Sequence, residues 1–292
     1  MELDDLVEDT VAADHDQIQG DVSGWVWLVR GDRCTRIARL TGGGELMHPD
    51  VKIHCDRPVG AGGQQRMLRR LRAWVRDVVE DLRGELPEPA SPATRGLRYV
   101  LEQRLGTVSR SGASDSMSAM DEADRRALGG LTFGRRHIYA AALLTPASLR
   151  QRWMLYAAKF GRPLSPAGFG RPSFAIAVKT EDAELEAGGY GRVGRYAVRV
   201  DVLDRVVRRV EKAARKAEGA TFDLPEELPA LLGLDPDDAE GVVIALGFPR
   251  EAEGFVVKRR SRRSRRGRRR PRRSRPSGRG RNSRPSPSSE SG

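Results

Sequence analysis

The sequence lacks the features of a secreted or membrane protein. Two cysteines, Cys34 and Cys55, in 292 residues exclude a disulfide framework and fit a reducing cytosol. Residues 1–21 carry eight acids and no Lys or Arg, so they do not form the basic and apolar start of a secretory signal. The longest apolar runs, around 138–144 and 241–247, are far too short to cross a bilayer. We therefore expect a soluble, cytoplasmic protein with no membrane partner.

Catalytic signatures are also missing. The chain contains no Gly-x-x-x-x-Gly-Lys-Ser/Thr, no Gly-x-Ser-x-Gly and no His-Glu-x-x-His. Asp121-Glu-Ala-Asp124 spells the metal-binding letters of a helicase, but it follows a Ser-rich segment instead of a buried strand. We interpret Asp121 as an acid at the N-terminus of a helix. The sequence therefore predicts no catalytic residue and no cofactor, and the isolated chain is not expected to be an enzyme.

Gly189-Tyr-Gly-Arg-Val-Gly194 matches the Gly-x-Gly-x-x-Gly pattern of dinucleotide-binding proteins. That site needs a strand before the glycines and a helix after them, so that the pyrophosphate meets the helix N-terminus. Here an acidic, helix-like segment precedes the glycines and the strand-like Tyr196–Val200 follows them. We interpret the segment as a flexible connector.

Cys34, His48, His54 and Cys55 are the side chains from which a Cys₂His₂ metal site would have to be built. Zinc modules pair their ligands at short fixed spacing, whereas Cys34 stands alone. His54 and Cys55 are sequence neighbours, which point to opposite faces of a strand. We therefore predict no metal site, and one bound zinc per chain in elemental analysis would overturn that prediction.

Apolar periodicity predicts a helix-rich α+β fold made of several small modules. Trp25–Val29 and Arg33–Leu40 flank a Gly-Asp pair and predict a β-hairpin, and residues 51–53 predict a third strand. Three-and-four spacing of apolar residues predicts helices over 64–83 and 93–105.

Later segments carry clear helix start and stop signals. Thr145-Pro146 begins a predicted helix that reaches Phe160, and Asp201 is expected to cap a helix to Glu218. Helices at 225–232 and 236–246, followed by a strand at 254–257, predict a small winged-helix-like arrangement.

Composition divides the chain into six stretches. They are an acidic disordered leader (1–22), a β-hairpin plus helical module (23–108), a Ser-rich loop (109–120), a middle helical module (121–187), a C-terminal winged-helix-like module (188–257) and an Arg/Ser/Gly/Pro tail (258–292).

Arginine is abundant, and it is concentrated in the tail. Residues 258–292 hold 16 Lys and Arg against the single acid Glu290, a net charge of +15, so the rest of a chain of +12 carries −3. Such a segment cannot bury enough apolar surface to offset its chain entropy, and we expect it to be disordered and to bind polyanions. The expected partner is nucleic acid, RNA or single-stranded DNA, and the alternative is a solubility tail or a signal for another protein. The residues predicted to contact nucleic acid are Lys258, Arg259, Arg260, Arg262, Arg263, Arg265, Arg266, Arg268, Arg269, Arg270, Arg272, Arg273 and Arg275.

Two weaker candidates lie in the body of the chain. The predicted helix over 64–83 carries a basic cluster that would extend a nucleic-acid track or form an ordinary solvated face: Arg66, Arg69, Arg70, Arg72 and Arg76. The helix that starts at Pro236 opens with Asp235, Asp237 and Asp238, which would repel phosphates. We interpret that helix pair as a packing or protein-docking module.

Two sets of segments resemble a known family. The first set is Arg36–Leu40, Arg69–Trp74, Leu131–Arg135, His137–Tyr139 and Leu143–Pro146, and the second, more specific set is Gly194–Leu203, Leu231–Leu234 and Ile244–Phe248. Their order is similar to the C-terminal accessory region of alphaproteobacterial helicase-related proteins, DExH-type superfamily-two enzymes similar to the mitochondrial degradosome RNA helicase. The resemblance covers about residues 24–258.

The resemblance implies a nucleic-acid-binding accessory region, RNA in preference to DNA, with a separate helicase ATPase subunit as a candidate partner. The family's ATPase lobes would lie before residue 1, so no ATP-binding or Mg²⁺-binding residue can be carried over. The alternative function is a protein-interaction scaffold that docks on a helicase or ribonucleoprotein partner.

Overall fold

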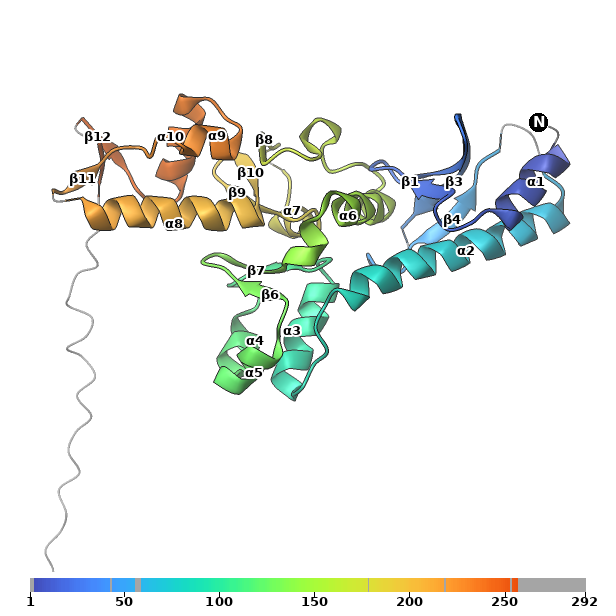
Figure 1. Cartoon of the computed structure of the whole chain (residues 1–292), viewed down its shortest axis with the longest axis horizontal. Helices are drawn as coiled ribbons and strands as arrows, with labels where there is room; N and C mark the ends of the chain where they lie inside the picture. The colour runs from blue at the N-terminus through green and yellow to red at the C-terminus, as the bar shows by residue number, and fades with distance from the viewer. Residues whose placement is uncertain are drawn as a thin grey trace, which may run out of the picture. The chain divides into compact units, whose positions relative to one another are not determined.

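Apolar alternation in the first sixty residues produces an antiparallel sheet of order β1-β2-β3-β4. The protein is described here by a computed structural model, which covers residues 3–42, 44–55, 59–177, 179–217, 219–252 and 254–256 (Figure 1). The sheet consists of β1 (Ile18–Gly20), β2 (Trp25–Arg30), β3 (Arg33–Thr41) and β4 (Asp50–Ile53). The predicted hairpin and third strand are confirmed.

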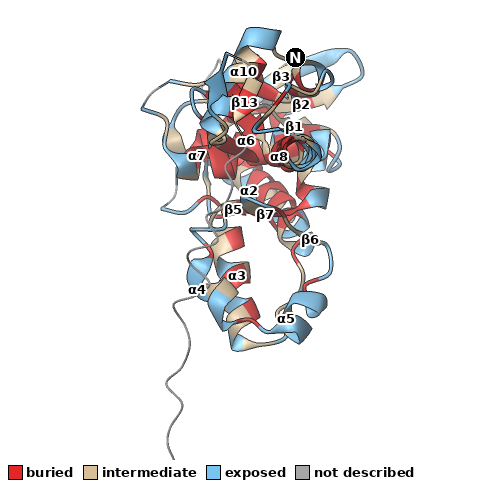
Figure 2. Cartoon of the chain, turned by 90° about the vertical axis from the view of Figure 1, so that its left-hand side faces the viewer, coloured by how far each residue is buried: buried red, intermediate tan, exposed pale blue. Residues whose placement is uncertain are grey.

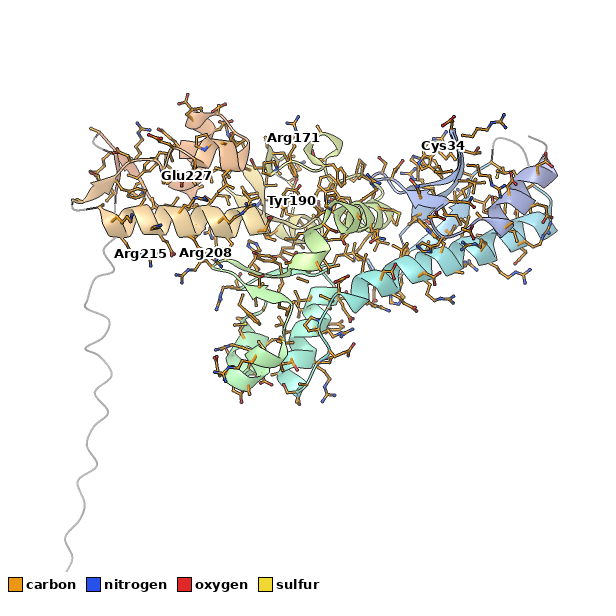
Figure 3. The ribbon with its side chains drawn as sticks, viewed as in Figure 1. Cys34, Arg171, Tyr190, Arg208, Arg215 and Glu227 are labelled. Carbon is orange, nitrogen blue, oxygen red and sulfur yellow. The ribbon has the colours of Figure 1, made fainter. Side chains whose placement is uncertain are left out.

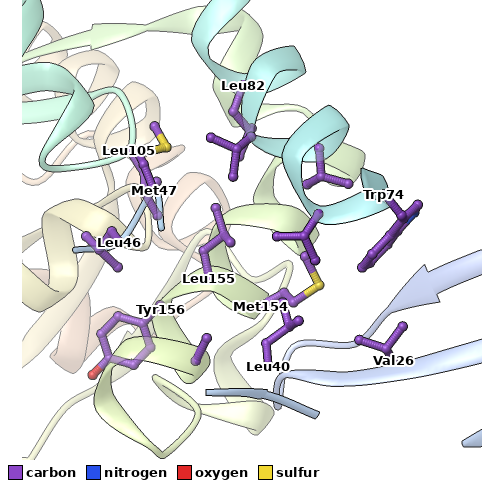
Figure 4. Close-up of a cluster of buried hydrophobic side chains, with 14 of the residues drawn as sticks. Val26, Leu40, Leu46, Met47, Trp74, Leu82, Leu105, Met154, Leu155 and Tyr156 are labelled. Atoms are coloured by element: carbon purple, nitrogen blue, oxygen red, sulfur yellow. The ribbon is translucent and has the colours of Figure 1, made fainter. Parts of the chain in front are cut away.

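Two long helices pack against the inner face of this sheet. They are α2 (Ala61–Gly84) and α6 (Pro146–Phe160). Figure 4 shows Val26 and Leu40 of the sheet meeting Trp74 of α2 and Met154 of α6 in one apolar core. Both helices were predicted. In α6, the Thr145 side chain accepts a hydrogen bond from the Ser148 N–H, as the sequence indicated.

The prediction of a disordered leader over residues 1–22 is wrong for residues 3–22, and residues 1–2 lie outside the described residues. Residues 3–12 form helix α1 (Leu3–Ala12), and Leu6 and Val7 are buried in the same core as the sheet. A methyl group on Gly63 would lie 3.1 Å from Val7 Cγ2, so the glycine lets α1 approach α2 closely. The acids misled the interpretation, because Asp5 and Glu8 are exposed while Leu6 and Val7 find a tertiary partner.

The next part of the chain folds around a second small sheet of order β5-β7-β6. Its strands are β5 (Thr107–Ser109), β6 (Leu131–Phe133) and β7 (His137–Ala140), and its helices are α3 (Pro92–Glu102), α4 (Ser114–Ala119), α5 (Glu122–Ala127) and the 3₁₀ turn η1 (Ala141–Leu144). Residues 109–120 are therefore not only a loop, because Ser114–Ala119 is helical and packs on α3. Residues 131–144 form the β6–β7 hairpin followed by the 3₁₀ turn. In Figure 2, α4 and α5 are largely exposed, whereas buried residues surround α6.

The last part carries two more three-stranded sheets. One has the order β8-β10-β9 and contains β8 (Ser173–Ala175), β9 (Tyr190–Val193) and β10 (Tyr196–Arg199), with η2 (Pro166–Gly168) and α7 (Asp182–Ala187) beside it. Residues 190–193, predicted to be part of a connector, are therefore a strand. Helix α8 (Val200–Lys216) follows, with Arg199 at the N-cap position and Asp201 inside the first turn instead of capping it.

The C-terminal elements run helix, strand, two helices and a hairpin, which is a winged-helix-like order. After α8 come β11 (Thr221–Phe222), α9 (Leu228–Leu232), α10 (Pro236–Ala245), β12 (Arg250–Glu251) and β13 (Gly254–Val256), with sheet order β11-β13-β12. These elements share their own apolar core around Val206, Leu232 and Val242. The fold class is α+β, as predicted. None of the helices in the described ranges combines the length and apolar character needed to cross a bilayer.

Candidate nucleic-acid interface

The tail residues predicted to contact nucleic acid, Lys258 to Arg275, lie outside the described residues. Among the described residues, a surface that suits nucleic acid has to lie in the body of the chain. The outer face of the β1–β4 sheet is such a surface, and sequence reasoning did not single it out.

The pleat of β2 divides its side chains between the two faces. Val26 and Leu28 are buried against the core, while Trp25 and Trp27 point to the outer face and are partly exposed. The Trp27 indole N–H donates to the Asp21 carboxylate at 3.0 Å. The same carboxylate accepts the backbone N–H groups of Ser23 and Trp25 at 2.8 and 3.1 Å, so it fixes the entry into β2.

A β-bulge in β3 brings two arginines to this same face. Val26 pairs with Ala38, and Trp27 pairs with Arg36, so Ile37 is the extra residue. Ile37 and Ala38 are adjacent and both fully buried, which an unbroken strand does not allow. Arg36 and Arg39 are three residues apart and would otherwise point to opposite faces. Because of the bulge, both lie beside the tryptophans.

Cross-strand pairing arranges these side chains in two rows. One row is Gln19, Trp27 and Arg36, and the next is Trp25, Arg39 and Lys52. The Arg36 guanidinium carbon lies 4.5 Å from the Trp25 ring centre and 5.8 Å from that of Trp27. The Arg39 guanidinium carbon lies 5.0 Å from the Trp25 ring centre.

The face is basic as well as aromatic. Within the described ranges no carboxylate lies within ion-pair distance of Arg36 or Lys52, and Arg39 is held by the backbone carbonyl of Gly161 at 3.4 Å. The His54 ring stands edge-on to Trp25, with ring centres 5.0 Å apart. Indoles that stack on bases and cations that neutralise phosphates are the groups that single-stranded nucleic acid requires.

The arginine cluster predicted on α2 is only partly available. Arg66 pairs with Glu8 at 2.7 Å, and Arg70 donates twice to the Ala13 carbonyl, at 2.8 and 3.1 Å. These two residues tie α1 to α2. Arg69 and Arg72 are exposed, and within the described part of the chain they make no ion pair.

A second basic surface lies on α8. Figure 3 shows Arg208 and Arg215 projecting from this helix. The cations of its first three turns are paired: Arg205 with Asp201, Arg208 with Asp204 and Arg209 with Glu227. The last turns carry exposed cations without a described acid partner, namely Lys212, Arg215 and Lys216.

The motifs that resemble catalytic sites have structural roles. Asp121 caps α5 by accepting the Asp124 N–H at 2.8 Å, and the Asp124 side chain accepts the Asp121 N–H in return. Gly189 and Gly194 both adopt positive φ, at the start and at the turn of the β9–β10 hairpin. No helix follows β9 directly, so these glycines do not form a dinucleotide site.

The candidate metal ligands are dispersed. Cys34 is exposed and lies at the start of β3, next to the turn that joins β2 to β3 (Figure 3). His54 packs on Trp25. His48 interacts with Glu45 at 3.1 Å. Within the described ranges, no group of three or more His, Cys, Asp or Glu is arranged to hold a metal ion.

One polar cavity, of about 210 Å³, lies between β7, α7 and β9. Burial, together with the nearby Arg136 charge, lowers the pKa of His137 to about 4. Glu186 accepts the Ser109 N–H at 3.0 Å and faces Arg104 at 3.6 Å, and burial raises the pKa of this carboxyl group. Asp182 pairs with Arg192 at 2.6 Å. Glu186 and Asp182 are therefore both engaged in contacts that stabilise the fold.

Three acids at the start of α10 also have structural partners. Asp235 caps the helix, Asp238 pairs with Arg195, and Glu240 pairs with Arg250. Helix α10 therefore offers phosphates no free cation at its N-terminus, and the outer face of β1–β4 is the stronger candidate.

Comparison of the chain with protein-family models, with curated proteins and with solved structures finds no match in any of the three.

Proposed function

We propose that this protein binds single-stranded nucleic acid, RNA in preference to DNA, as a non-catalytic accessory region of a helicase-related system. The observation that carries the proposal is the outer face of β1–β4, where Trp25 and Trp27 lie beside Arg36, Arg39 and Lys52. The family resemblance supports the preference for RNA and the association with a helicase motor.

The geometry suggests how a strand would bind. An exposed cation–π contact is worth about 0.5–1 kcal/mol, whereas a base stacked on an aromatic ring contributes about 1–3 kcal/mol. A base therefore replaces a guanidinium on the Trp25 ring at a net gain. The displaced guanidinium stays within reach of the adjacent phosphate, where it forms charge-assisted hydrogen bonds. The basic tail adds contacts that are unspecific and depend strongly on salt.

The test is a fluorescence anisotropy titration of a labelled, single-stranded RNA with three full-length proteins. The double variant Trp25→Leu/Arg36→Glu should bind roughly 10- to 100-fold more weakly than the wild type, since stacking and a phosphate contact are both lost. The control is Arg95→Glu/Tyr99→Leu, which makes the same charge change and a similar aromatic-to-leucine change at exposed positions of α3. It should bind within about twofold of the wild type. Equal weakening of both variants would refute the interface.

A second arm measures the tail. A chain that ends at Val257 retains every described residue and should bind with lower affinity and a shallower salt dependence. Equal, salt-insensitive affinity of the two chains would remove the tail from the proposal and leave the sheet face.

A further inference from the structure

The outermost strand of the first sheet, β4, has an unpaired edge. The His54 N–H donates to the Ile37 carbonyl at 2.9 Å, which fixes the ladder: residues 50, 52 and 54 hydrogen-bond to β3. The N–H and C=O groups of Val51 and Ile53 therefore point away from β3. Within the described ranges these four groups have no backbone partner. An edge of this kind pairs readily with another extended chain.

A groove runs along this edge, between β4 and α2. Two adjoining cavities of about 360 and 460 Å³ share Val51 and follow one stripe of α2 from Gln64 to Arg83. The walls are aliphatic, formed by Val51, Val59, Leu68, Val75 and Val79. No Phe, Tyr or Trp side chain lines either cavity, and the imidazole of His48 lies at the second one.

Cations dominate the rim of the groove. Lys52, Arg72, Arg76 and Arg83 outnumber Asp50 and Glu80 among the lining residues. The Arg83 Nε atom is buried and has no hydrogen-bond partner. Arg72 has no ion-pair partner within the described ranges, and Arg76 has only Asp77 at 4.0 Å.

We propose that this groove binds an extended peptide of a partner protein, with alternating apolar and acidic residues, which adds as a further strand beside β4. The unpaired backbone groups require a strand, the aliphatic walls accept every second side chain, and the cationic rim favours acids in the others. The chain's own tail, with a net charge of +15, is excluded as the occupant by charge. Nucleic acid is disfavoured because the groove offers no Phe, Tyr or Trp ring for stacking.

This surface shares only Lys52 with the proposed nucleic-acid interface. Trp25 and Arg36 lie on the outer face of the sheet, whereas the groove lies along the β4 edge and α2. Peptide binding and RNA binding can therefore succeed or fail independently.

The probe is the fluorescein-labelled heptapeptide Val-Glu-Val-Glu-Val-Glu-Val, and its control is the same peptide N-methylated at every internal backbone nitrogen. The control keeps the side chains and charge, so it has equal attraction to the tail, but it has no N–H to donate to β4. We expect the full-length protein to bind the unmethylated peptide at least about tenfold more tightly. Equal binding of both peptides would mean capture by charge alone and would overturn the proposal.

Two further readouts locate the peptide. Arg72→Glu/Arg76→Glu should weaken binding at least about fivefold, while Arg69→Glu/Arg95→Glu, with the same charge change away from the groove, should differ by less than about twofold. Hydrogen exchange of the Val51 and Ile53 amides should slow at least about tenfold on peptide addition. Unchanged exchange at these amides, or slowing by single-stranded RNA and not by the peptide, would overturn the proposal.

Discussion

The stability of the fold should depend on the protonation of His137. The ring of this histidine packs so closely on Gly191 that a methyl group there would lie 2.3 Å from Cε1, and burial lowers the pKa of His137 from 6.5 to about 4. The unfolded chain thus binds a proton at a higher pH than the folded chain does. The contribution of His137 to the free energy of unfolding is therefore fully present above about pH 6.5. It declines as the pH falls from 6.5 toward 4.

The magnitude follows from the two pKa values. Each pKa unit corresponds to about 1.4 kcal/mol, and the loss between pH 7.5 and 4.5 from this one group is at most about 2.5 kcal/mol. His137→Gln keeps a polar side chain of similar reach but does not titrate. The variant should therefore lose about 2 kcal/mol less than the wild type over this pH range, whatever the carboxylates contribute, because the two proteins share them.

Urea unfolding followed by tryptophan fluorescence at several pH values gives both curves. An NMR titration of the four histidines, with His137→Gln used to assign the signal, measures the pKa directly. A His137 pKa at or above 6, or equal pH dependence of the two proteins within about 0.5 kcal/mol, would refute the reasoning.

Three other predictions follow from contacts in the body of the chain. Gly191→Ala should destabilise the protein by about 1–3 kcal/mol, because the new methyl group meets the His137 ring, whereas Gly241→Ala in α10, with open space around it, should not destabilise it; urea unfolding compares the two. Arg152 is fully buried, has no carboxylate partner among the described residues, and donates to three backbone carbonyls and a threonine hydroxyl, so Arg152→Met should cost at least about 3 kcal/mol in the same assay. Asp121→Ala removes a capping box and should cost about 1 kcal/mol, with faster amide exchange confined to α5, and a global change would contradict that role.

Local signals in the sequence were sufficient where a segment determines its own structure. The spacing from Met67 to Leu82 defines α2, and Thr145 with Pro146 defines the start of α6, because periodicity and capping act within a few turns. Helix α1 was missed because the acids dominate the composition of this segment and hide the apolar positions Leu6, Val7 and Val11. Their burial depends on α2, which lies fifty residues later.

The candidate interface shows the same limit. The sequence placed Trp25 and Trp27 on one strand and Arg36 and Arg39 on the next, but strict alternation puts the two arginines on opposite faces. The adjacent apolar pair Ile37-Ala38 was the one available signal of a bulge. The free edge of β4 could not be predicted, since it depends on which strands pair and where α2 lies.

The central claim is that the tryptophans of the β1–β4 sheet contact nucleic acid, and their indole N–H signals test it most directly. The chain has four tryptophans, and two of them, Trp74 and Trp153, are buried in the core, with the Trp153 N–H bonded to the Gly188 carbonyl at 3.0 Å. In a ¹⁵N NMR titration of the full-length protein with single-stranded RNA, the signals of Trp25 and Trp27 should shift while those of Trp74 and Trp153 stay in place. Saturation with RNA that leaves the Trp25 and Trp27 signals unchanged would contradict the account.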